Sequence, residues 1–341
     1  MWRPLTLVLL GLCGLVVFLV FAGALWLRAG LHPVGAGEER VLHIPAGTGT
    51  AGIAHLLRQN RLIRDELAFG VALRQWGFAG KLRAGYYRLS PRMSGEEIAR
   101  TIAEGRIAKA KVTIPEGFTV AQIGEKLEKE GLCTAEEFLE AANPATVSQL
   151  GFSLEGNSLE GYLFPDTYVI EYGTTPADIV RQIVADWGRQ VASGLKWDFK
   201  QSNSGGRTRS EIMTIASMIE REAQIGKDRP LIASVIYNRL RKGMRLQIDA
   251  TVIYALGAHR PRLTYRDLQV DSPFNTYRYR GLPPHPICNP GLPSIRAALH
   301  PAQTDYLFYV ARHDGSHVFT RTYEEHRRAI REVRGQATGD R

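Results

Sequence analysis

The sequence predicts an α+β protein with one N-terminal transmembrane helix, two small α+β units and a C-terminal mixed α/β domain. Three observations predict this organisation. The chain begins with a long uncharged apolar run, a strand-and-helix pattern occurs twice, and two helices and a hairpin occupy the last third. The expected boundaries are 1–28 for the transmembrane helix, 40–112 and 113–186 for the repeats, and 187–336 for the C-terminal domain.

The apolar run extends from Leu5 to Leu27 and contains no charged side chain. As a helix it would reach roughly 35 Å, which is enough to cross a bilayer. Trp2 and Trp26 flank it, where indole rings favour the membrane interface. A cleaved signal peptide is the alternative, because Ala22-Gly23-Ala24 resembles a cleavage site, although a signal peptide has a shorter apolar region. We expect a retained anchor, with Arg3 on the inner side and most of the chain outside the cytoplasm.

The composition and the motifs argue against a nucleic-acid-binding protein, a metalloprotein and a cofactor-dependent enzyme. The net charge is +9, but the basic residues are scattered, which favours a solvated basic surface over a nucleic-acid-binding patch. Cys13, Cys133 and Cys288 form no CxxC or Cys/His metal pattern, so we expect no metal site. A phosphate loop, a dinucleotide fingerprint and an HExxH motif are all missing from the sequence, so we expect no cofactor.

The repeat has an offset of 70 residues, because Ile44-Pro45-Ala46-Gly47 aligns with Ile114-Pro115-Glu116-Gly117. Each copy predicts a strand that ends at this motif and two helices after it. Gly85-Tyr86-Tyr87 and, more loosely, Gly161-Tyr162-Leu163 predict a second strand, and Ser94 and Pro176 predict the start of a last helix. Such a pair of modules can bind a repetitive ligand or serve as a duplicated scaffold, and the pattern does not decide between these roles.

The polar, Gly/Ser-rich stretch 200–206 is interpreted as a flexible loop or a domain boundary. Ser210 is a candidate cap for a helix with Ile212, Ile215 and Ile219 on one face, and a second helix opens at Asp228 and Pro230. A hairpin is predicted around Asp314-Gly315, followed by a polar helix from Tyr323 to about Val333.

Two glutamates lie at the borders of the apolar stripe on the first of these helices. At about 100° per residue, Glu220 falls on one border and Glu222 on the other. A carboxyl group at such a border is partly dehydrated and can hold its proton to higher pH, as a general acid must. Helix geometry does not choose between the two, and a solvated Glu-Arg-Glu charge run is the alternative.

Further polar residues follow this helix pair. Gln247 and the loop Asn275-Thr276-Tyr277 provide amides and an aromatic ring, which suit a sugar-binding surface. Asp249 can equally cap a helix that begins at Ala250. The Pro- and Gly-rich segment 281–291 is interpreted as a stiff structural loop, and His300 and His317 as structural histidines.

An ordered set of motifs resembles the endolytic murein transglycosylases of the MltG (YceG-like) family. The resemblance covers nearly the whole chain and departs from the family pattern at Phe274 and at Met218-Ile219. The matching motifs are Leu159-Glu160-Gly161-Tyr162-Leu163-Phe164-Pro165-Asp166, Ala216-Ser217-Met218-Ile219-Glu220-Arg221-Glu222, Asn238-Arg239-Leu240, Gly243-Met244-Arg245-Leu246-Gln247, Asn275-Thr276-Tyr277, Gly281-Leu282-Pro283-Pro284 and Asn289-Pro290-Gly291.

This resemblance implies a single-pass protein of the inner membrane with a LysM-like module and a catalytic domain that faces the cell wall. It implies a lytic transglycosylase that cuts the MurNAc–GlcNAc β-1,4 bond of peptidoglycan, leaves a 1,6-anhydro end and acts on nascent strands. It places the catalytic acid/base at Glu220. Candidate substrate contacts are Gln247, Asn275 and Tyr277, with the carboxyl groups of Glu160 and Asp166 as further candidates. Peptidoglycan synthases are the expected partners.

Two other functions fit parts of the sequence. In the first, the repeats hold glycan and Glu220 is a surface charge, which describes a cell-envelope protein that binds peptidoglycan without cutting it. The second is a soluble enzyme with pyridoxal phosphate, because proteins of this family have sometimes been labelled aminodeoxychorismate lyases. The N-terminal apolar run argues against the second reading.

Overall fold

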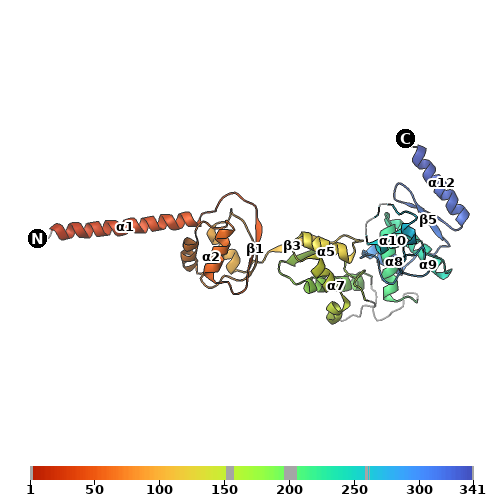
Figure 1. Ribbon diagram of the computed structural model, residues 1–341, viewed down its shortest axis with the longest axis horizontal. Helices are drawn as coiled ribbons and strands as arrows, with labels where there is room; N and C mark the ends of the chain where they lie inside the picture. Colours follow the sequence, from red (N-terminus) through yellow and green to blue (C-terminus); the bar gives the residue numbers. More distant parts are fainter. Residues whose placement is uncertain (1–2, 151–156, 196–205, 258–259, 261, 340–341) are drawn as a thin grey trace. The chain divides into compact units, whose positions relative to one another are not determined.

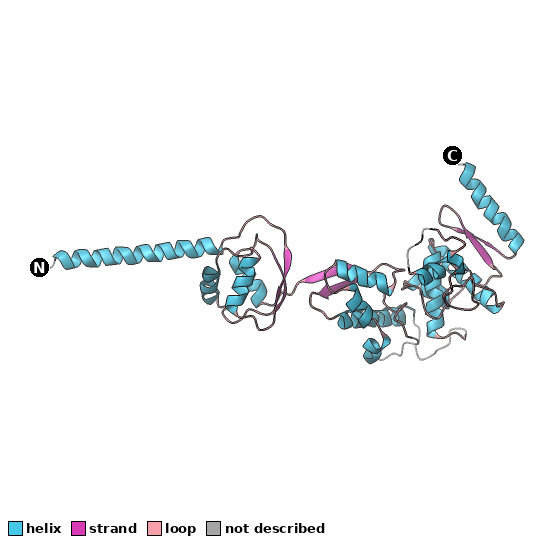
Figure 2. Cartoon of the chain, viewed as in Figure 1, coloured by secondary structure: helices cyan, strands magenta, loops and turns pink. Residues whose placement is uncertain are grey.

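A computed structural model describes residues 3–150, 157–195, 206–257, 260 and 262–339 (Figure 1). The chain forms two compact units. One contains Met1–Ala110 and Ile170–Gly173, and the other contains Lys111–Val169 and Thr174–Arg341. Among the described residues, the strands form three two-stranded pairs between the helices (Figure 2). The predicted loop at 200–206 lies outside these residues except for Gly206.

Helix α1 (Arg3–Leu31) contains the predicted apolar run. Its segment Val8–Leu31 is long and apolar enough to cross a membrane, as predicted. The large apolar side chains between Val8 and Trp26 are exposed, so the rest of the chain does not cover them. The end of the helix is different, because Gly30 packs closely against Ala68.

The first repeat is built on the strands β1 (Arg40–Ile44) and β2 (Gly85–Leu89). They pair antiparallel, with Arg40 opposite Leu89 and Ile44 opposite Gly85. Alternate side chains of both strands point into a core that also receives apolar side chains from the helices. These helices are α2 (Thr50–Gln59), α3 (Glu66–Gln75) and α4 (Gly95–Ala103).

The second repeat follows the same order. Strand β3 (Lys109–Thr113) pairs with β4 (Thr167–Glu171). Capping boxes at Thr119 and Thr134 start its first two helices. The helical segments are α5 (Val120–Lys129), α6 (Ala135–Ala141), the 3₁₀ helix η1 (Pro144–Leu150) and α7 (Pro176–Leu195). The predicted helix starts at Ser94 and Pro176 are confirmed.

The prediction of a strand at Gly161-Tyr162-Leu163 is wrong, because this segment is a buried turn and β4 begins later. Tyr168 on β4 is the true counterpart of Tyr87 on β2. Each hydroxyl group donates to the carbonyl oxygen four residues earlier, at 2.7 Å for Tyr168 and 2.9 Å for Tyr87. The repeat offset therefore changes from 70 to 81 residues after the helices, because the second copy contains an insertion.

The C-terminal part is mostly helical. It is less mixed than predicted, because its strands in the described residues form one hairpin, with Phe308 opposite Thr320. That hairpin confirms the turn predicted around Asp314-Gly315. The elements are α8 (Arg209–Glu222), η2 (Gly226–Asp228), α9 (Arg229–Arg241), α10 (Asp249–Leu256), η3 (Asp267–Gln269), α11 (Leu292–Leu299), β5 (Phe308–Ala311), β6 (His317–Thr320) and α12 (Tyr323–Gly339).

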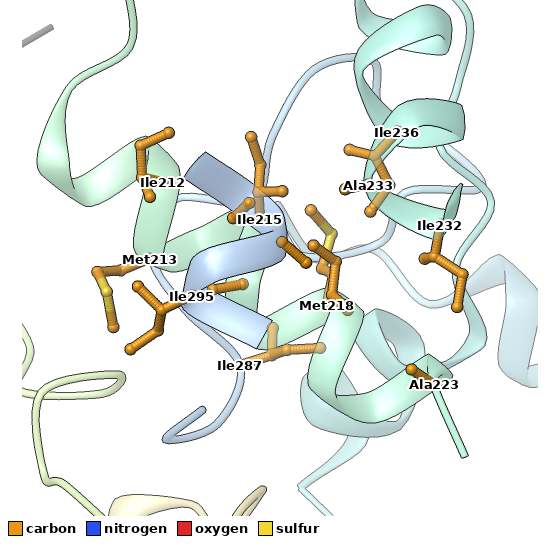
Figure 3. Close-up of a cluster of buried hydrophobic side chains, with 14 of the residues drawn as sticks. Ile212, Met213, Ile215, Met218, Ala223, Ile232, Ala233, Ile236, Ile287 and Ile295 are labelled. Carbon is orange, nitrogen blue, oxygen red and sulfur yellow. The ribbon is translucent and has the colours of Figure 1, made fainter. Parts of the chain in front are cut away.

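Helix α8 lies at the centre of this part. Figure 3 shows Ile212, Ile215 and Met218 of α8 among apolar side chains of α9, α11 and the segment before α11. Every residue from Ile212 to Ile219 is buried. Such close packing fixes the position of the helix and therefore of its last residues.

Two predicted helix caps differ from those observed. Thr208, not Ser210, caps α8, and its side chain accepts from the backbone N–H of Glu211 in a capping box. Asp249 is the first residue of α10 and makes no capping bond, because its carboxylate accepts from Tyr277 instead.

Candidate active site

Glu220 is placed by the last turn of α8. It follows the buried run of that helix, and 7% of its side chain is exposed. The side chain therefore lies at the border of the core, as the helical spacing predicts. The interpretation of Glu220 as a solvated surface charge is not supported by this burial.

Two donors meet the Glu220 carboxylate. The backbone N–H of Gly291, the residue that precedes α11, donates to Oε2 at 3.0 Å. The Arg229 guanidinium lies 3.5 Å from Oε1, and its Nε donates to Ser294 at 3.0 Å. These donors stabilise the ionised carboxylate, and the N–H comes from the positive end of a helix. A carboxyl group in this setting can release a proton and take one back.

The loop 281–291, interpreted from sequence as structural, thus contributes a group of the site. Asn289 fixes its end, because its side-chain oxygen accepts from the backbone N–H of Gly161 at 2.9 Å and of Leu163 at 2.8 Å. Its own N–H donates to Phe118 O at 2.8 Å. The loop is structural and it also positions Gly291 beside Glu220.

A second carboxyl group, from Glu116, reaches the same glycine. A Cβ atom built on Gly291 would lie 1.8 Å from Glu116 Oε1, so the carboxyl group occupies the space that glycine leaves. The pKa of Glu116 is raised by partial burial and then by the charge of Glu220, while Arg229 lowers it. Sequence reasoning missed Glu116 as a site residue, although one signal was present: the repeats have alanine at 46 and glutamate at 116.

Glu222 has a different environment. It faces the β5–β6 hairpin, where the Tyr309 hydroxyl donates to its Oε2 at 3.1 Å. Burial raises the pKa of Glu222 to about 7, partly offset by the Tyr309 hydrogen bond. Glu220 and Glu222 therefore have separate partners, and Glu220 is the one beside Gly291 and Arg229.

Gln247 and Tyr277 lie in a polar cluster near Glu222. Arg239 joins the cluster by donating to Gln247 Oε1 at 3.2 Å and to Leu246 O at 2.8 Å. Gln247 is exposed and has a φ of 53°, an uncommon conformation for a residue other than glycine. Tyr277 donates to Asp249, and burial together with that carboxylate raises the pKa of its hydroxyl group.

Asn275 is fully buried at 0% exposure, beside the buried Thr276. Its amide donates to Leu268 O at 3.0 Å and to Val270 O at 2.8 Å, and its oxygen accepts from Tyr277 N at 3.0 Å. The amide therefore holds the loop that presents Tyr277, and the predicted sugar contact at Asn275 stays a prediction.

Glu160 and Asp166 have different surroundings. Glu160 is 3% exposed and accepts from Val120 N at 3.1 Å, Asn289 Nδ2 at 3.1 Å and Tyr254 at 3.3 Å. It joins the start of α5 to the loop before Gly291. Asp166 is exposed, and its carboxylate accepts from its neighbour Thr167 at 2.6 Å.

His317 is buried and has an acidic partner. Both its backbone N–H and its ring Nδ1 lie within 3.0 Å of Asp228 Oδ2, which links the hairpin to the start of α9. In the described part of the chain, no group of three or more His, Cys, Asp or Glu residues is arranged to hold a metal ion. The three cysteines are free.

Comparison with known proteins gives consistent results. The YceG-like family profile matches residues 42–332. A Bacillus subtilis (strain 168) protein named endolytic murein transglycosylase is 36% identical, over 91% of this chain and 90% of that protein. A Streptococcus pneumoniae (strain ATCC BAA-255 / R6) protein of the same name is 31% identical, over 89% of this chain and 60% of that protein. A crystal structure of a YceG-like protein from Listeria monocytogenes has a TM-score of 0.57 and 36% identity, covering 86% of this chain and 99% of that one.

Proposed function

Because the chain belongs to the YceG-like family, we propose that it is an endolytic murein transglycosylase that cuts peptidoglycan strands with Glu220 as acid and base. One observation carries this proposal. Glu220 is a largely buried carboxyl group that is held by a backbone N–H and a guanidinium at the start of α11. The alternative of a wall-binding protein without catalysis gives this arrangement no role.

In the first step, protonated Glu220 donates its proton to the oxygen between N-acetylmuramic acid and N-acetylglucosamine. The bond from the muramic C1 to that oxygen breaks, and the glucosamine leaves with a hydroxyl group. Positive charge develops at C1. The Gly291 N–H and Arg229 support this step, because they stabilise the carboxylate that remains.

In the second step, the C6 hydroxyl group of the same muramic acid attacks C1. Its proton passes to ionised Glu220, which restores the starting state, and the product has a 1,6-anhydro ring. Water is not consumed. Ordinary glycosidases require two carboxyl groups, whereas here an internal hydroxyl group replaces water and one residue serves both steps. The intramolecular attack also gains effective concentration.

Substrate contacts are proposed at Gln247 and Tyr277. Gln247 is exposed, and Tyr277 provides a ring on a loop that Asn275 holds in place. Aromatic rings and amides together suit the apolar faces and hydroxyl groups of sugars. Asn275, Glu160 and Asp166 are weaker candidates for substrate contacts. Asn275 and Glu160 are buried with hydrogen-bond partners, and the Asp166 carboxylate accepts a hydrogen bond from its neighbour Thr167.

The rest of the chain is proposed to hold this site near the wall. In this proposal the repeats are LysM-like modules that bind glycan, and α1 anchors the protein in the inner membrane with the site outside. In the first repeat, His43 and Tyr86 stack with ring centres 4.3 Å apart, an aromatic surface that suits a sugar. Nascent strands are the proposed substrate, and peptidoglycan synthases are the proposed partners.

The test compares two variants of one helix. Glu220→Gln removes the proton donor, so cleavage of purified glycan strands is expected to fall by about 100-fold or more while binding remains. Glu222→Gln is the matched control and is expected to retain most of the activity. Full cleavage by Glu220→Gln would reject the proposal, and loss in Glu222→Gln alone would move the catalytic role to that residue.

A further inference from the structure

We infer that Glu116 is a positioning residue of the active site, whose carboxyl group acts through Glu220 by keeping one proton between the two. This inference rests on the proposed function. It adds a residue from the second repeat to a site that is otherwise formed by the C-terminal helices.

The two carboxyl groups converge on Gly291. The N–H of this glycine donates to Glu220 at 3.0 Å, and Glu116 occupies the position that a side chain at 291 would need. The turn that carries Glu116 also lies close to the catalytic side chain, because a Cβ atom built on Gly117 would be 3.8 Å from Glu220 Cγ. The lack of a side chain at Gly291 therefore leaves room for Glu116 beside the N–H that binds Glu220.

The turn that carries Glu116 is held in place by bonds to the same region. Gly117 N donates to Asn289 O at 2.9 Å, and Asn289 N donates to Phe118 O at 2.8 Å. The Arg221 guanidinium, one residue after Glu220, donates to Gly117 O at 3.4 Å. The position of Glu116 beside Glu220 thus follows from backbone contacts and does not depend on a flexible side chain alone.

The first repeat provides an internal comparison. Gly47 and Gly117 have the same φ of 80°, so the two copies make the same turn. The residue before the glycine is Ala46 in the first copy and Glu116 in the second. Because the turn forms with alanine, a glutamate at this position is not required for the fold. The carboxyl group appears in the copy that reaches Gly291.

Charged and titratable groups surround Glu116 and Glu220. Arg229 on α9 faces both carboxyl groups, and it is 3.5 Å from Glu220. Arg221 on α8 approaches the turn backbone, and Cys288, ahead of α11, is buried beside Glu220. Partial burial and then the charge of Glu220 raise the pKa of Glu116. Two nearby carboxyl groups that share one guanidinium resist double ionisation, which favours keeping one proton at the site. A general acid needs that proton.

The test is the pH dependence of cleavage by Glu116→Gln and Glu116→Ala in the full chain. Both variants are expected to fold like the parent, because Ala46 occupies the equivalent turn. We expect the high-pH limb of the rate profile to move to lower pH, because the neighbouring charge that retains the proton is gone. Glu125→Gln, an exposed residue of α5, is the control for loss of one negative charge.

Three outcomes decide the inference. A shifted limb in both Glu116 variants, with the profile of Glu125→Gln unchanged, supports it. A profile that overlays the parent, or a loss that is equal at every pH, overturns it, because a structural role does not move the limb. Failure of the proposed function looks different, since Glu220→Gln would then remain active.

Discussion

Glu160 is a buried carboxyl group with three hydrogen-bond donors around it. The donors favour its ionised form, but the loss of solvent is the larger effect and raises the pKa of Glu160 to about 8. Because its partners link α5 to the loop before Gly291, the protonation of Glu160 affects how firmly this loop is held beside the active site.

Stability is expected to depend on this residue between about pH 4.5 and pH 8. The folded carboxyl group keeps its proton in this range, whereas the unfolded one loses it above 4.5. The stabilisation is complete below pH 4.5 and is lost as pH rises toward 8, at about 1.4 kcal/mol for each pKa unit at most. Thermal unfolding of Glu160→Gln should therefore change less between pH 5 and pH 8 than that of the parent chain.

Glu125→Gln, with its exposed side chain, serves as the reference for this measurement. It should reproduce the pH dependence of the parent. Identical slopes for the parent and Glu160→Gln would show that Glu160 does not hold a proton in the folded state.

At the scale of elements, patterns within one helix or turn were predictable, and partners far along the chain were not. The hairpin at Asp314-Gly315 and the helix start at Ser94 follow from local chemistry. Helical spacing placed Glu220 at a core border but left Glu222 equal to it, and the family resemblance favoured Glu220. Glu116 was missed because its role depends on Gly291, which only the fold brings near.

The errors at this scale also have local causes. Ser210 and Thr208 are both hydroxyl residues near the start of α8, and the choice between them depends on Glu211, which closes a capping box with Thr208. The second strand of the second repeat was placed too early because an insertion breaks the 70-residue offset. Tyr168, which repeats the hydrogen bond of Tyr87, gives the correct alignment.

Removal of the observed cap should destabilise the protein. Thr208→Ala deletes the side chain that accepts from Glu211 N, so the free energy of unfolding in urea should fall by about 1 kcal/mol. Ser210→Ala is the paired control and should change it by less than about 0.5 kcal/mol. Equal losses in the two variants would contradict the assignment of the cap.

At the scale of the whole molecule, the apolar helix α1 stands out from the folded part of the first unit, to which it belongs. The exposed apolar side chains between Val8 and Trp26 have no partner in the described part of the chain, which is costly in water. The proposed anchoring of α1 in a bilayer would cover them. Gly30 is buried against Ala68, whereas the large side chains from Val8 to Trp26 are exposed, so we expect that residues 1–28 can be removed without disturbing the core of the first repeat.

Deletion of residues 1–28 should release the protein from membranes. The full chain is expected to remain in the membrane fraction after an alkaline carbonate wash, whereas the shortened chain should be soluble and should still cleave isolated glycan strands. Release of the full chain, with a new N-terminus after Ala24, would instead indicate a cleaved signal peptide.

The most direct test of the central claim is the mass of the new strand ends after digestion of intact glycan strands by the full chain. If Glu220 carries the proton in both steps and no water enters, each cut within a strand leaves a 1,6-anhydro muramic end. Glu220→Gln should yield no such ends. Ordinary reducing ends, heavier by one water, would contradict the account, because they require water as the nucleophile.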